Sequence, residues 1–297
     1  MDVSRSDTRS ATLRRAAALA LATAVVAVVS AVWTGLDPGL LHGPAAMQGS
    51  ARGTAVVLGA MAVPVLLASV RRALRGSAPA LVIWGGALLY VVYNALLFLF
   101  LTPFNAAFLA YVVMLGIALW ATGYLLATPE VWRAAEVIAR RAPGRAIAAY
   151  VWVVVLLNTL AWLANILPSL GKHPAPMLEG TGVATNAIYV QDLALWLPLA
   201  AVAALWLRRR EPRGSLVVGA VLGMWVIESV SIAVDQSFGV RADPSSPVVS
   251  LAVIPPFVAL AVVGLVPLWL LLRTAREPEP GSGRASEEQG RRSLAAR

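Results

Sequence analysis

Long apolar blocks alternate with short polar connections along almost the whole chain. A block of about twenty apolar residues can cross the ~30 Å hydrocarbon core of a bilayer as a helix, and lipid leaves a single span no other way to satisfy its backbone. The blocks lack the alternation of apolar and polar residues that transmembrane strands show. The pattern therefore predicts an all-α, polytopic transmembrane helical bundle of eight spans. The spans fall at about residues 16–33, 54–70, 80–101, 106–126, 146–167, 193–207, 215–236 and 251–272, the sixth extending one turn upstream.

The basic residues predict the orientation of this bundle. Of 24 lysines and arginines, only Arg52, Lys172 and Arg241 fall in the connections on one side of the predicted spans. The others flank the spans on the opposite side, beginning with the segment 1–15. Cytoplasmic connections of membrane proteins carry the excess of basic residues, so we expect both termini in the cytoplasm. The net charge of +9 is then an orientation signal, and no nucleic-acid partner is expected because no basic face with interleaved aromatic residues exists elsewhere.

Composition excludes several classes of protein and site. A chain that is 59% hydrophobic and 13% charged cannot cover the surface of a soluble globular enzyme. The absence of cysteine excludes disulfides and thiolate metal sites, and both histidines, His42 and His173, lie in predicted connections. No nucleophile motif or phosphate-binding loop is present. We therefore predict no catalytic residue and no metal site, do not expect an enzyme, and can name no cofactor.

The two halves of the chain resemble each other. Residues 71–77 and 209–215 match at five of seven positions, and Tyr90 and Glu228 share their spacing of 138 residues. Spans 1–4 (16–126) and 5–8 (146–272) therefore look like parallel four-helix repeats related by an axis along the membrane normal. The alternative is that any two arginine-flanked spans look alike.

The segments outside the repeats have their own patterns. The linker 127–145 contains Thr128, a helix N-cap, followed by Trp132, Ala135 and Ile138 roughly on one face, which predicts a cytoplasmic interfacial helix. The tail 273–297 mixes Glu, Gly, Ser and Arg and is expected to be disordered. Residues 29–31 resemble a signal-peptidase site, so cleavage that leaves seven spans is an alternative. A duplicated first span argues against it.

Ionisable and amide side chains gather in the outer halves of the predicted spans. Glu228 lies deep in the seventh span, where burial of a carboxyl group is costly and marks a candidate functional site. Ser231 and Asp235 share its helix face, and no arginine or lysine lies inside any span. We predict an outward-facing polar cavity between the two halves. Its candidate ligand- or ion-binding residues are Glu228, Ser231, Asp235, Asp192, Asn94, Tyr90, Asn158 and Asn165.

Two interpretations of these residues remain open. In the first, the cavity binds a small molecule or a cation, and the protein is a transporter or a ligand-binding sensor. In the second, Glu228 bonds Tyr90 or an asparagine and only holds helices together. The second would suit a non-catalytic membrane subunit or scaffold that packs against a partner protein. The lipid bilayer is a partner in either case.

Two short segments carry a resemblance to a known family. They are Thr102-Pro103-Phe104-Asn105 and Gly182-Val183-Ala184-Thr185-Asn186, the latter leading into Tyr189-Val190-Gln191-Asp192-Leu193. The chain resembles, over most of residues 34–236, a family of uncharacterised bacterial multispan integral membrane proteins. The resemblance implies a multi-pass protein of the bacterial plasma membrane and no known activity. In that family a histidine often stands where Tyr189 stands here, so no role of that histidine is carried over.

Overall fold

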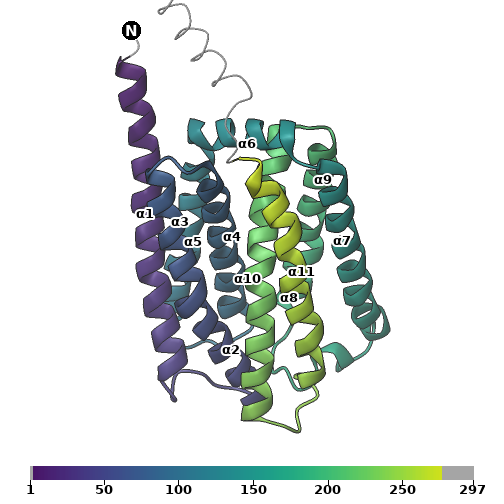
Figure 1. Ribbon diagram of the computed structural model, residues 1–297. Helices are drawn as coiled ribbons and strands as arrows, with labels where there is room; N and C mark the ends of the chain where they lie inside the picture. The colour runs from purple at the N-terminus through teal and green to yellow at the C-terminus, as the bar shows by residue number, and fades with distance from the viewer. Residues whose placement is uncertain (1–2, 276–297) are drawn as a thin grey trace, which may run out of the picture.

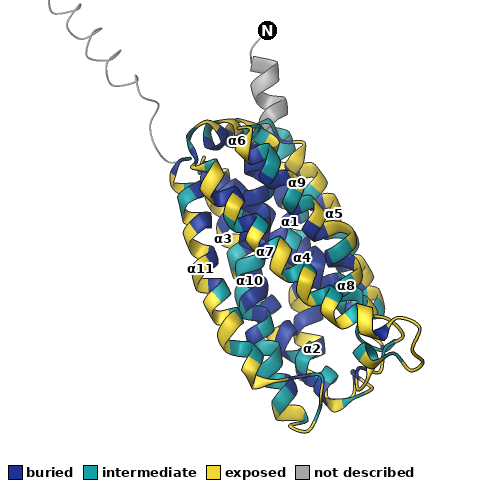
Figure 2. Ribbon diagram, turned by 90° about the vertical axis from the view of Figure 1, so that its right-hand side faces the viewer, coloured by how far each residue is buried: buried dark blue, intermediate teal, exposed yellow. Residues whose placement is uncertain are grey.

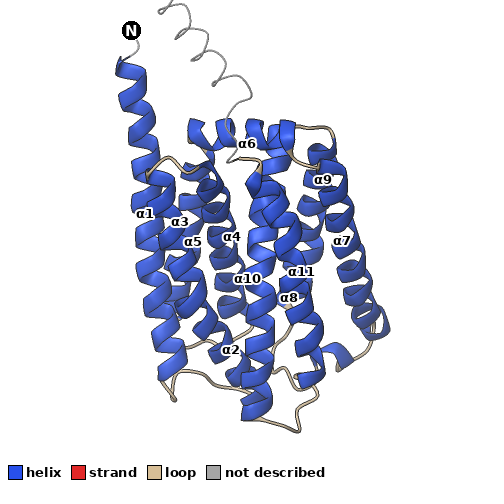
Figure 3. Ribbon diagram, in the orientation of Figure 1, coloured by secondary structure: helices blue, strands red, loops and turns tan. Residues whose placement is uncertain are grey.

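The chain folds into a bundle of long, mostly antiparallel helices (Figure 1). The computed structural model describes residues 3–275, with side chains from residue 11 onwards, and every regular element in that part is helical (Figure 3). The predicted tail 273–297 thus lies almost entirely outside the described residues. The α-helices are α1 (Val3–Leu36), α2 (Ala45–Val57), α3 (Val63–Leu74), α4 (Ala78–Phe100), α5 (Phe108–Leu126), α6 (Pro129–Arg141), α7 (Gly144–Ile166), α8 (Ala187–Gln191), α9 (Leu197–Arg208), α10 (Pro212–Ala242) and α11 (Ile254–Arg273). Short 3-10 turns occupy η2 (Leu167–Ser169), η3 (Pro176–Leu178) and η5 (Leu251–Val253), and π-helical turns occupy η1 (Leu58–Ala62) and η4 (Asp192–Trp196).

Within residues 3–275, eight helical passages are long and apolar enough to cross a membrane. This number agrees with the predicted spans and makes this an integral membrane protein. Both ends of the described chain lie at the same end of the bundle, together with α6 (Figure 1). We call this end the arginine end, because the α3–α4 and α9–α10 connections with their arginines lie there. The opposite end, with the connections 37–44, 101–107, 170–186 and 243–250, is the loop end.

The second span begins earlier than its hydropathy predicts. Residues 45–53, expected in a loop, form the first turns of α2, so the predicted start at residue 54 is wrong. These turns are rich in small residues, which allow α2 to pack closely against the C-terminal part of α10. A Cβ on Gly49 would lie 2.5 Å from the Phe238 carbonyl oxygen, and one on Gly53 would lie 2.6 Å from the Asp235 Cα atom. Tertiary packing of small residues, rather than apolar side chains, stabilises this stretch.

Substitution of Gly53 with alanine should lower the stability of the fold. The added Cβ would meet the α10 backbone, which cannot move aside as a flexible side chain can, and overpacking of this kind costs about 1–3 kcal/mol. Gly116→Ala on α5 is the matched control, because a Cβ there has nothing within 4 Å and gains the same helix propensity. Thermal unfolding of the purified protein should show a lower Tm for Gly53→Ala than for Gly116→Ala. Equal Tm values would contradict the close α2–α10 contact.

Two spans contain a π-helical turn next to a proline. In the second span η1 precedes Pro64, and in the sixth span η4 precedes Pro198. Proline lacks an N–H group, and its ring clashes with the carbonyl of the fourth residue before it; here those residues, Ala60 and Ala194, lie inside the π-helical turns. The widened turn lets each helix continue past its proline. The sixth span therefore extends upstream to Ala187, further than the one turn predicted.

The linker helix α6 lies across the arginine end of the bundle (Figure 1). Its buried face is formed by Val131, Ala135 and Ile138 rather than by the predicted Trp132, which is 39% exposed. The Trp132 indole instead donates a hydrogen bond to the Leu126 carbonyl at 2.7 Å. Because the Ser215 hydroxyl donates to the Ala135 carbonyl at 2.7 Å, α6 is fixed to α10. The helix α6 therefore packs into the bundle, in addition to lying at its arginine end.

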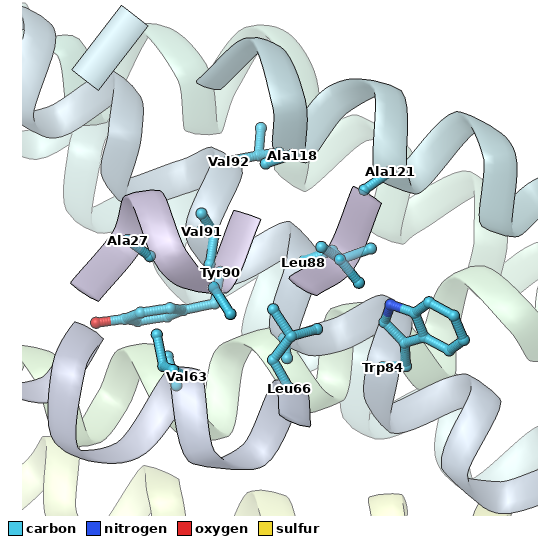
Figure 4. Close-up of a cluster of buried hydrophobic side chains, with 14 of the residues drawn as sticks. Ala27, Val63, Leu66, Trp84, Leu88, Tyr90, Val91, Val92, Ala118 and Ala121 are labelled. Atoms are coloured by element: carbon cyan, nitrogen blue, oxygen red, sulfur yellow. The ribbon is translucent and has the colours of Figure 1, made fainter. Parts of the chain in front are cut away.

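The interior is densest around α4 and α10. Trp84, Leu88 and Tyr90 of α4 are fully buried, and Figure 4 shows Tyr90 at one end of this cluster, with its hydroxyl directed away from Trp84. The second half of the bundle is looser at the loop end. Residues 155–168 of α7 and η2 and 251–260 of η5 and α11 include no buried position, and Figure 2 shows the exposed side of α11.

Candidate functional site

Glu228 lies near the middle of α10, against α4. Its side chain is 9% exposed, and the fully buried Asn94 amide donates a hydrogen bond from Nδ2 to Glu228 Oε2 at 2.8 Å. The same amide group donates to the Tyr90 carbonyl one turn earlier, at 3.2 Å. These two bonds hold the Asn94 side chain in place across the α4–α10 contact.

A second contact between the same helices lies beside the first. The Tyr90 hydroxyl donates a hydrogen bond to Ser231 Oγ at 3.0 Å, and both side chains are buried. We call Glu228, Asn94, Tyr90 and Ser231 the Glu228 network. Four of the eight predicted site residues thus come together, as the shared helix face of Glu228 and Ser231 predicts.

The Glu228 network has more acceptors than donors. Within residues 11–275, the fully buried Asn94 amide oxygen has no hydrogen-bond partner, and the Glu228 carboxyl group accepts one hydrogen bond, from Asn94. An ionised carboxylate offers about four acceptor positions. Within residues 11–275, no arginine, lysine or histidine forms an ion pair with Glu228. The arrangement can therefore accept a proton, a cation or a hydrogen-bond donor of a ligand.

Asp192 lies in a different set of contacts. It is 8% exposed at the start of η4, and the Trp162 indole of α7 donates to its Oδ2 atom at 2.9 Å. The Tyr93 side chain of α4 lies near this carboxylate. Aromatic rings pair around it, Trp162 with Tyr189 at 4.8 Å and Tyr93 with Trp196 at 6.1 Å between ring centroids. We call these five residues and Gln191, whose Oε1 accepts a hydrogen bond from Trp196 Nε1 at 3.0 Å, the Asp192 cluster.

Asp235 lies on α10 about two helical turns beyond Glu228, towards the loop end. Its carboxylate accepts a hydrogen bond from the Gln236 amide at 3.0 Å, and Gln236 in turn accepts one from the Ser250 backbone at 2.9 Å. The carboxyl groups of Asp192 and Asp235 both interact electrostatically with Glu228. Among the described residues, however, no three His, Asp or Glu side chains are close enough to hold a metal ion.

The structure does not bring the two α7 asparagines into these networks. Asn158 is half-buried, and no hydrogen bond to its side chain is recorded within the described part of the chain. Asn165 is exposed, and its amide donates to the Ala161 carbonyl of its own helix at 2.9 Å. Both lie on the stretch of α7 that has no buried position.

Sequence reasoning missed most of the Asp192 cluster. Trp162 lies near the end of a predicted span, where tryptophan is common at the membrane border. Gln191 and Trp196 are five residues apart, a spacing that does not share a face in an α-helix. The π-helical turn η4 brings this pair together. The one signal was Pro198, because a proline inside a span requires an adjustment of the preceding turn.

The two motifs of the family resemblance have structural roles. Asn105 accepts a hydrogen bond from the Ala107 backbone at 3.0 Å and donates to the Pro103 carbonyl at 2.9 Å, which closes the α4–α5 hairpin. Asn186 caps α8 by accepting from the Ile188 backbone at 3.0 Å, and Gly182 has a φ of 69° in the preceding turn. These motifs fix the loop end, where the Asp192 cluster begins.

Comparisons with known proteins assign no family. No family model, no curated protein and no solved structure matches this chain.

Proposed function

We propose that this protein binds a small cation or cationic solute from the outer side of the membrane, as a transporter or a ligand-binding sensor. The loop end faces outwards and the arginine end faces the cytoplasm, in keeping with the distribution of basic residues. The site is an outward-facing polar cavity with Glu228 at its base, in a protein of the bacterial plasma membrane. The observation that carries the proposal is the buried, unpartnered Asn94 oxygen beside the Glu228 carboxyl group.

In a network that served packing alone, we would expect every buried hydrogen-bond donor and acceptor to have a partner within the protein. Buried polar groups in folded proteins almost always have a partner, and an unsatisfied acceptor costs about 1–3 kcal/mol. Here the Asn94 oxygen has no donor among the described residues, the Glu228 carboxyl group accepts the hydrogen bond from Asn94, and the neighbouring Asp192 adds negative potential. A positively charged ligand would satisfy these groups together, whereas further helix packing would not.

We place the proposed route at the loop end of the second half. The part of α7 that carries Trp162 has no buried position, and Trp162 and Tyr189 are half-buried. They lie on the surface side of the cluster, and Tyr93 on α4 lies near both Asp192 and Glu228. A solute that entered beside α7 would meet Asp192 first and Glu228 afterwards.

We infer further that the bundle consists of two parallel four-span repeats, with a register that differs from the one the sequence match predicted. The π-helical turns begin at residues 58 and 192, the next helices at 63 and 197, and α4 and α10 at 78 and 212, a constant spacing of 134 residues. Gly76 and Arg210, at the same spacing, both have positive φ. This spacing supports a duplication whose register differs by four residues, about one helical turn, from the 138-residue sequence match.

In this register the site lies where the repeats meet. Asn94 and Glu228 are equivalent positions, 134 residues apart, and they share a hydrogen bond. Gly86 and Ala220 are also equivalent, and a Cβ on Gly86 would lie 2.9 Å from the Ala220 carbonyl oxygen. Repeat interfaces near the membrane midplane are where transporters commonly bind substrate and coupling ions. The first repeat has an asparagine at this position and the second has a glutamate, so only one of the two equivalent positions is acidic.

Cation-dependent stabilisation of the protein tests this function. A ligand that binds the folded state raises its stability, so a small cation should raise the Tm of the wild-type protein but not that of Glu228→Gln. A non-catalytic subunit or scaffold, in which Glu228 only joins α4 to α10, would show no such difference.

A further inference from the structure

We propose that the Asp192 cluster receives the ammonium group of a small organic cation that also carries an oxygen acceptor. The proposal rests on the proposed function, because Asp192 and Glu228 interact electrostatically and border the same polar region. It goes further by naming the chemical class of the solute.

The aromatic residues provide the first part of the argument. Trp162 and Tyr189 form one tilted pair, with planes 43° apart, and Tyr93 and Trp196 form another, with planes 49° apart. Organic ammonium groups bind to the faces of tryptophan and tyrosine rings, where the ring quadrupole attracts positive charge. The first pair is half-buried and the second is buried, so aromatic rings lie on both the surface side and the interior side of the cluster.

The carboxylate provides the second part. Asp192 is 8% exposed and accepts a hydrogen bond from the Trp162 indole, and Tyr93 rather than a basic residue lies near it. The bond from Trp162 orients the carboxyl group without adding a positive charge. When it is ionised, such a carboxylate attracts a cation and repels an anion.

The amide of Gln191 provides the third part. Its side chain is 8% exposed, its oxygen accepts a hydrogen bond from the Trp196 indole, and its Nε2 group has no hydrogen-bond partner in the described part of the chain. A buried, unpartnered donor next to a cation site calls for an acceptor oxygen on the same ligand. Alkali cations lack that acceptor. The combination fits an ammonium compound with a hydroxyl or carboxyl oxygen a few atoms away.

Three ligands of similar size separate these contributions. Choline has both the ammonium group and the oxygen, tetramethylammonium lacks the oxygen, and 3,3-dimethyl-1-butanol has the shape of choline without the charge. Each would be titrated into the full-length protein in a maltoside detergent free of choline lipids, with Tm and tryptophan fluorescence as readouts. We expect choline to give a saturable response, tetramethylammonium to bind about tenfold more weakly, and the neutral alcohol to give no response.

Variants then assign the response to the cluster. Asp192→Asn keeps an acceptor for Trp162 and should weaken choline binding by tenfold or more, and Trp162→Leu should weaken it by about tenfold. Trp120→Leu is the matched control, since Trp120 on α5 is 69% exposed and should leave the affinity unchanged.

The proposal is overturned if choline and the neutral alcohol behave alike, if tetramethylammonium binds as tightly as choline, or if Asp192→Asn retains the wild-type affinity. Failure of the proposed function looks different. If choline has no effect while an alkali or ammonium cation still stabilises the wild type but not Glu228→Gln, the solute class is wrong and the cation site stands. If Glu228→Gln responds to those cations as the wild type does, the cation site itself is wrong.

Discussion

Replacement of Glu228 with glutamine should abolish cation binding while the protein still folds. Glutamine has nearly the same shape and keeps an oxygen that can accept the hydrogen bond from Asn94, so the α4–α10 contact survives. It cannot carry a negative charge, so the attraction for a cation is lost. The wild type and the variant would be compared by Tm in sodium, potassium and ammonium chloride at constant ionic strength.

The expected difference is large enough to measure without knowledge of the physiological ligand. A cation present at about 100 times its dissociation constant stabilises the folded state by ~2.7 kcal/mol, several degrees in Tm. Glu136→Gln removes the same charge from an exposed position on α6 and should behave as the wild type does. If Glu228→Gln kept the full cation response, Glu228 would have only a packing role.

Replacement of Asn94 with leucine should cause the largest loss of stability. Leucine has a similar volume but cannot donate to Glu228, so a buried carboxyl group loses the one hydrogen bond recorded for it. Such a group costs about 2–3 kcal/mol when its partner is removed. Chemical or thermal unfolding in detergent should show this destabilisation relative to the wild type.

The double variant Asn94→Leu/Glu228→Leu should recover much of that stability. Replacement of both partners of a buried hydrogen bond by apolar groups of similar shape is nearly neutral, so the double variant should be more stable than Asn94→Leu alone. Simply additive effects would show that the two side chains do not interact, contrary to the 2.8 Å contact.

The spans could be predicted because a single span in lipid must be helical and apolar. The start of α2 could not, because residues such as Gly49 and Gly53 reveal their role only where α10 approaches. Hydropathy describes how apolar a side chain is, whereas these glycines matter because they have no side chain and so let α10 pack closely. Of the three residues predicted on one face of α6, Ala135 and Ile138 are buried, but Trp132 lies at the edge and Val131 is buried instead.

The candidate site was predictable only where regular helix spacing determines which residues share a face. Glu228 and Ser231 share a helix face by regular spacing, and both belong to the Glu228 network. Asn94 and Tyr90 were candidates, but their pairing with Glu228 and Ser231 depends on the α4–α10 register, which the 138-residue match shifts by one turn. Gln191 and Trp196 meet through a π-helical turn, which no regular periodicity describes.

The most direct test is whether water reaches the Glu228 network from the outer side. The chain has no cysteine, so Ser231→Cys and Ser229→Cys can each be labelled with a membrane-impermeant thiol reagent in right-side-out vesicles. Both serines are buried on α10, at 1% and 3% exposure, but they lie roughly 200° apart around the helix. Labelling of Ser231→Cys, and not of Ser229→Cys, is the result expected of an outward-facing cavity. No labelling at Ser231→Cys, or equal labelling of both, would contradict it.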